Sequence, residues 1–99
     1  MGKKLLARDV NEMLGAGIIV PMTAKQWLAM QDEFPLVDTI ETGLAGSILL
    51  VRRTSDKKGW ALVEQPKAEQ RVIRPFKNEK EARALIQDRL AAYERMWDG

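Results

Sequence analysis

The strand-like runs of this chain do not alternate between apolar and polar residues, and this feature constrains the fold more than any other. Residues 48–51, 60–63 and 72–73 are apolar at odd and even positions alike. Successive side chains of a strand point to opposite faces of a sheet, so a sheet with one wet face should alternate. These runs therefore predict a sheet that is covered on both faces.

The length and composition limit the chemistry. A chain of 99 residues has room for one hydrophobic core, so we expect a single α+β domain over residues 1–99. The sequence contains neither cysteine nor histidine, which removes disulfides, thiolate and imidazole metal ligands, and Ser-His and Cys-His nucleophile pairs. We expect no catalytic set of these kinds, no metal and no cofactor.

The amino-terminal segment shows no targeting pattern. Its basic residues are followed by an apolar stretch that Arg8 and Asp9 interrupt, and this stretch is too short for an export signal. No run approaches the ~20 apolar residues that a helix needs to span a bilayer. The sequence favours a cytoplasmic protein without membrane contact.

A first short helix is expected near the amino terminus. Asp9 and Glu12 have the spacing of a capping box, and Gly15 supplies a stop after the apolar face that follows. Residues 17–21 form a brief apolar run that ends at proline. We interpret this run as a connector.

A second helix and four strands follow the connector. Thr23 and Gln26 have the residue types of a standard capping box, which predicts a helix over about 24–34. Short links rich in turn formers then separate apolar segments, a pattern typical of an antiparallel meander. The predicted strands span residues 36–42, 47–54, 59–65 and 70–76. Pro75 cannot donate to a ladder, so the end of the last strand should lie at an edge or just outside the sheet.

The carboxyl-terminal segment carries the clearest helical pattern. Asn78 is expected to cap it, with Glu81 at the third helical position. Its apolar residues recur at helical spacing, namely Ala82, Leu85, Ile86, Leu90, Tyr93 and Trp97. The sequence thus predicts an α+β fold: two short amino-terminal helices, a three- to four-stranded antiparallel meander, and a long carboxyl-terminal helix packed on the sheet.

Covering the second face of this sheet leaves two alternatives. The amino-terminal helices could fold over it, or a second protein molecule could do so. An uncovered face would expose several hundred square ångströms of apolar surface, which soluble monomers rarely tolerate. A symmetric homodimer would bury one such patch twice.

The leading functional expectation is a small non-enzymatic protein-interaction or accessory domain that acts by self-association or by binding a protein partner. Tryptophan is over-represented among residues that dominate binding energy. Tyr93, Met96 and Trp97 lie near the end of the last helix and are the interface candidates. Asp38, Glu41 and Glu64 are carboxylates that could act in acid–base chemistry without histidine, but their spacing marks no pair.

Positive charge concentrates in residues 52–77, where eight Lys or Arg residues face three Asp or Glu residues. Such a segment suggests an anion or nucleic-acid site, because each phosphate neutralised by a cation releases counterions. The candidate residues are Arg52, Arg53, Lys57, Lys58, Arg71 and Arg74. Neighbouring arginines of a strand point to opposite faces, so these residues should form a basic rim at strand ends and hairpin tips. A nucleic-acid-binding module is therefore the alternative function.

Half of the chain is similar, in pattern only, to the DNA-binding modules of three strands and a helix that begin some phage integrases. The residues that carry this similarity are Lys58-Gly59-Trp60, Arg71 to Asn78, and Glu81-Ala82. Those modules read DNA with an open sheet face. The apolar strands of this chain predict a covered face instead.

Overall fold

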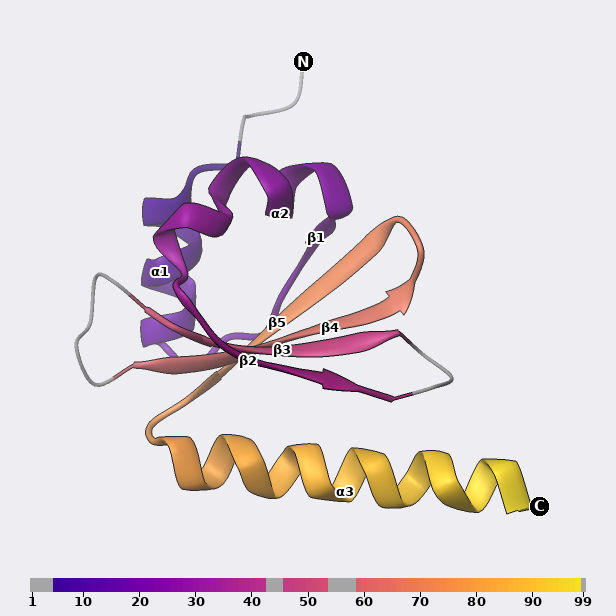
Figure 1. Ribbon diagram of the computed structural model, residues 1–99. Helices are drawn as coiled ribbons and strands as arrows, with labels where there is room; N and C mark the ends of the chain where they lie inside the picture. Colours follow the sequence, from indigo (N-terminus) through magenta and orange to yellow (C-terminus); the bar gives the residue numbers. More distant parts are fainter. Residues whose placement is uncertain (1–4, 43–45, 54–58, 99) are drawn as a thin grey trace.

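The structure, a computed structural model, describes residues 5–42, 46–53 and 59–98, with side chains up to residue 95. Its elements are α1 (Ala7–Gly15), β1 (Val20–Thr23), α2 (Ala24–Met30), the 3₁₀ turn η1 (Gln31–Glu33), β2 (Leu36–Glu41), β3 (Ser47–Arg52), β4 (Trp60–Lys67), β5 (Gln70–Phe76) and α3 (Glu79–Asp98). The five strands form one sheet in the order β1-β5-β4-β3-β2, and every pair is antiparallel. Figure 1 shows three layers, with α1 and α2 on one side of the sheet and α3 on the other.

Two apolar clusters fill the spaces between these layers. The first joins α1 and α2 to one face of the sheet and includes Val10, Trp27 and Val63. The second joins α3 to the other face and includes Leu62 and Ile86. The prediction of a sheet covered on both faces is confirmed. Of the two alternatives for the second face, the structure shows the first, because the chain's own amino-terminal helices pack on it (Figure 1).

β1 is a strand where the sequence predicted only a connector, so the predicted three- to four-stranded meander is part of a five-stranded sheet. Buried Val20 and Met22 alternate with exposed Pro21 and Thr23, as expected for a strand with one covered face. The sequence prediction ended the apolar connector at Pro21. Because β1 is an edge strand, however, a proline without an N–H donor is tolerated there.

Pro75 follows the same physical rule inside β5. β1 pairs with β5 only up to Ile73, so the stretch of β5 that contains Pro75 has β4 as its single neighbour. This stretch is a local edge, in agreement with the expectation from the sequence. The missing N–H of Pro75 therefore need not interrupt the ladder.

The helix starts were predicted with mixed success. Thr23 and Gln26 form the expected capping box at the start of α2, and Asn78 accepts a hydrogen bond from the Glu81 N–H at the start of α3. The predicted start of α1 was wrong, because this helix begins at Ala7. Asp9 lies within its first turn, where a carboxylate interacts favourably with the helix dipole.

Helix α3 is tied to the sheet by ion pairs as well as by apolar contacts. Glu64 of β4 accepts hydrogen bonds from Arg74 Nε at 3.4 Å and from Arg89 Nε at 3.1 Å. Near the start of α3, Arg83 contacts Asp38 of β2 at 3.2 Å and Glu79 at 2.7 Å. The pKa of Arg83 is raised above its ordinary value, mainly by the hydrogen bond to Glu79 and then by that to Asp38. Within the described ranges, no helix combines the length and apolar character needed to cross a membrane.

Candidate functional site

The two arginines at the end of β3 have different environments. The Arg52 guanidinium lies over the Trp60 ring, 4.7 Å from its centroid, on the side of the sheet that faces α3. Arg53 lies against α1 on the opposite side and is only 7% exposed. The expected alternation of these neighbours is therefore seen, but Arg53 is buried and does not lie on a solvated rim.

The Arg53 guanidinium donates hydrogen bonds to neutral groups. Its Nε donates to Asn11 Oδ1 at 3.2 Å, and its Nη2 donates to the Asn11 backbone carbonyl at 3.0 Å. Asn11 is itself 7% exposed. Among the described residues, no carboxylate lies within ion-pair distance of Arg53. A guanidinium cannot lose its proton in a protein, so Arg53 keeps its positive charge in this buried position, where its described partners are neutral.

An open cleft of about 640 Å³ lies beside Arg53. It is formed where the carboxyl end of α1 meets the end of β3, the start of β4 and the end of β5. Its walls are mainly apolar, with polar groups at a few positions. The residues that line it are Leu14, Gly15, Gly17, Ile19, Arg53, Gly59, Arg74, Pro75, Phe76, Lys77 and Glu81.

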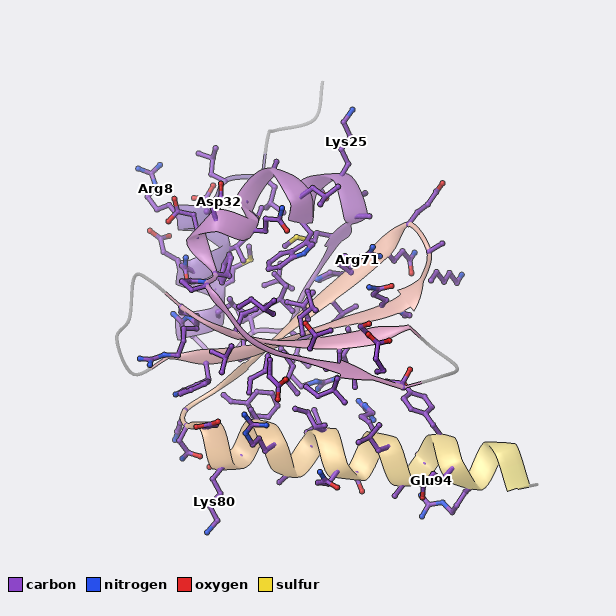
Figure 2. All side chains as sticks on the ribbon, viewed as in Figure 1. Arg8, Lys25, Asp32, Arg71, Lys80 and Glu94 are labelled. Carbon is purple, nitrogen blue, oxygen red and sulfur yellow. The ribbon has the colours of Figure 1, made fainter. Side chains whose placement is uncertain are left out.

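Of the other basic candidates, Arg74 also lines this cleft, whereas Arg71 does not. Arg71 donates to the backbone carbonyls of Ala68 and Gln70, near the turn between β4 and β5. Figures 1 and 2 place this turn at the opposite end of the sheet from the end of β3. Arg74 is paired with Glu64. The predicted Lys57 and Lys58 lie outside the described residues.

The aromatic end of α3 is described only in part. Tyr93 is half-buried and borders a groove of about 360 Å³ with Pro66, Val72 and Arg89. The side chains of Met96 and Trp97 lie outside those that the structure describes. Figure 1 shows the last turn of α3 extending beyond the sheet.

The free edge of β2 is a feature that the sequence analysis did not single out. Leu36 is 58% exposed and Val37 is 43% exposed. Beside Leu36 lies a notch of about 330 Å³ whose lining includes Trp27, Phe34 and Leu49. This strand therefore has an outer edge next to apolar side chains of the amino-terminal layer. The predicted meander already places this strand at an edge of the sheet, whereas the notch beside it was not predicted.

The carboxylates considered for acid–base chemistry are not brought together. Asp38 is paired with Arg83, Glu41 accepts a hydrogen bond from Ser47 Oγ at 3.0 Å, and Glu64 is held by two arginines. In the described part of the chain, no cluster of side chains suited to a metal ion is found.

Comparison of this chain with protein-family models, with curated proteins and with solved structures finds no match. Two surfaces stand out from the geometry. One is the exposed edge of β2, and the other is the cleft beside Arg53.

Proposed function

We propose that this chain is a non-enzymatic association domain, and that it forms a homodimer by pairing the free edge of β2 with β2 of a second copy. The observation that carries this proposal is an edge strand whose outer side has no neighbouring strand among the described residues. Natural edge strands are usually protected from pairing by lysine, proline, a β-bulge or a covering loop, and the register shift of β2 affects only its first half. β2 contains neither lysine nor proline, in contrast to β1 at the other edge, which contains Pro21.

The backbone of β2 offers donors and acceptors to a second strand. The Thr42 N–H donates to the Gly46 carbonyl, so the backbone groups of Thr42 point towards β3. In an antiparallel ladder, hydrogen-bonded and non-bonded pairs alternate. The backbone groups of Ile40 therefore point towards β3 as well, whereas those of Thr39 and Glu41 point away from the sheet. The register shift between Leu36 and Asp38 limits regular pairing to the second half of the strand.

One register makes this edge complementary to itself. If the two-fold axis passes beside Ile40, Thr39 pairs with Glu41 of the second copy, and Glu41 pairs with its Thr39. The outward backbone groups of both strands are then hydrogen-bonded. The half-buried Ile40 meets Ile40 of the second copy, which extends the apolar cluster beneath α3. Asp38 lies opposite Thr42 of the second copy, so no two carboxylates face each other.

A charge series at Thr39 tests this register. Thr39 is exposed, so its substitution should leave the monomer intact. Thr39→Glu places a carboxylate opposite Glu41 at two symmetric positions, and we expect it to raise the dimer dissociation constant roughly tenfold. Thr39→Lys should lower this constant, whereas the uncharged Thr39→Gln should stay close to the parent chain. Sedimentation velocity at protein concentrations from about 10 µM to about 1 mM measures the dimer dissociation constant of the parent chain and the three variants. The high concentrations are needed because such a small interface predicts a weak dimer.

Two results would contradict the proposal. One is a parent chain that remains monomeric over the whole concentration range. The other is a dimer whose dissociation constant is the same for Thr39→Glu and Thr39→Lys. A dimer that Trp97→Ala abolishes and that the Thr39 series does not affect would instead favour the aromatic end of α3, the interface expected from the sequence.

Nucleic-acid binding remains the alternative prediction, but the placement of the arginines supports it less. Their guanidinium groups are divided between the two ends and the two faces of the sheet. The open sheet face used by integrase-type modules is covered by α1 and α2 here. Titration with mixed-sequence duplex DNA at two salt concentrations decides the question. If the logarithm of the binding constant falls with the logarithm of the salt concentration by ~0.9 per contacted phosphate, this alternative is favoured. The absence of binding at low salt would exclude it.

A further inference from the structure

We propose that the cleft beside Arg53 binds a small organic anion that carries a carboxylate head and an apolar tail. This site is separate from the β2 edge, and neither proposal depends on the other. Three features of the described residues support it: an edge of the Arg53 guanidinium that has no described partner, glycines that let the backbone pack closely against this guanidinium, and apolar walls next to it.

The guanidinium of Arg53 has one occupied edge and one free edge. Nε and Nη2 form one fork, and both donate to Asn11. The other fork is formed by Nη1 and the second Nη2 proton, and it has no hydrogen-bond partner among the described residues. A planar pair of parallel N–H donors matches the two oxygens of a carboxylate.

Two glycines flank the amino groups of this guanidinium, and both line the cleft. A Cβ atom on Gly59 would lie 3.2 Å from Nη1 and 3.0 Å from Cδ of Arg53. A Cβ atom on Gly15 would lie 3.3 Å from Nη2. Side chains at these positions would therefore crowd Arg53. Glycine lets the backbone approach the guanidinium closely at the wall of the cleft.

The side chains that line the cleft indicate the chemistry of the ligand's tail and the number of its charges. Leu14, Ile19 and Phe76 provide apolar surface, which suits an aliphatic or aromatic tail. Lys77 and Arg74 add two cations, of which Arg74 is paired with Glu64, whereas Glu81 adds an anion. A single charged head fits this arrangement better than a polyanion, because Glu81 would repel additional negative charge.

Octanoate and octanol, which share a tail length, test the proposal. We expect octanoate to bind the full chain at least tenfold more tightly than octanol, as measured by isothermal titration calorimetry. Arg53→Met should weaken octanoate binding at least tenfold and leave octanol binding unchanged. The matched control Arg71→Met removes an arginine at the far end of the sheet and should bind octanoate as the parent chain does. Glu81→Gln should strengthen octanoate binding.

Equal affinities for octanoate and octanol would overturn the proposal, as would octanoate binding that Arg53→Met does not change. Because Arg53 is buried, its substitution is expected to lower the stability of the fold, so a second measurement uses the parent chain alone. In a ¹⁵N-labelled sample, octanoate should shift the amide signals of Gly15, Gly17 and Gly59. Signals that shift only at other positions, or not at all, would also overturn the proposal.

Discussion

Trp27→Ala is expected to lower the free energy of unfolding by about 3–5 kcal/mol, the usual range for truncating a buried aromatic residue to alanine. Trp27 is 5% exposed and packs against Phe34 at a ring-centroid distance of 5.6 Å. It belongs to the cluster that joins the amino-terminal helices to the sheet. Its removal leaves a cavity in this layer and also loses the aromatic contact.

Leu28→Ala is the matched control, because Leu28 is the next residue of the same helix and is 63% exposed. We expect this control to change the free energy of unfolding by no more than about 0.5 kcal/mol. Urea unfolding followed by circular dichroism measures both variants without relying on tryptophan fluorescence. Similar unfolding midpoints for the two variants would contradict the placement of α2 on the sheet.

Ile86→Ala should lower the free energy of unfolding by about 2–5 kcal/mol. Ile86 is 3% exposed and lies in the cluster between α3 and the sheet. Because α3 covers this face with a single helix, the cavity has few neighbouring side chains that can move to fill it. Melting temperatures should fall by about 4–8 °C for each kcal/mol lost.

The neighbouring substitution Gln87→Ala is the control for this face. Gln87 is exposed, and alanine has a high helix propensity, so we expect little change in stability. Differential scanning calorimetry of both variants gives the comparison. If Gln87→Ala were as destabilising as Ile86→Ala, the assignment of the buried side of α3 would be wrong.

Local signals in the sequence predicted much of this fold. The last four strands and α3 follow from apolar runs, turn formers and caps such as Thr23 and Asn78, because neighbouring residues alone produce these patterns. β1 was missed because Pro21 resembles a terminator. Its position at an edge, where proline is tolerated, depends on pairing with β5 and therefore on residues far along the chain.

The candidate sites were harder to predict from the sequence than the strands and helices, because they also depend on contacts between residues far apart in the chain. Arg53 was placed on a rim because its partner, Asn11, is 42 residues away and has no distinguishing pattern. Gly59 was predicted only as the start of a strand, and the structure shows that it flanks a guanidinium. The predicted meander places β2 at an edge of the sheet, as the structure shows. The notch beside Leu36 was not predicted, because it is formed by residues of separate segments.

The pairing of β1 with β5 has a consequence for synthesis of the chain on the ribosome. Val20 pairs with Ile73, so the amino-terminal helices have no complete surface to pack on until β5 has been translated. At about 5–20 residues per second, Trp27 would wait roughly 3 to 10 seconds for that surface. During this interval the nascent chain exposes apolar side chains that a chaperone could recognise. The early part of this protein therefore depends on its late part to become protected from aggregation.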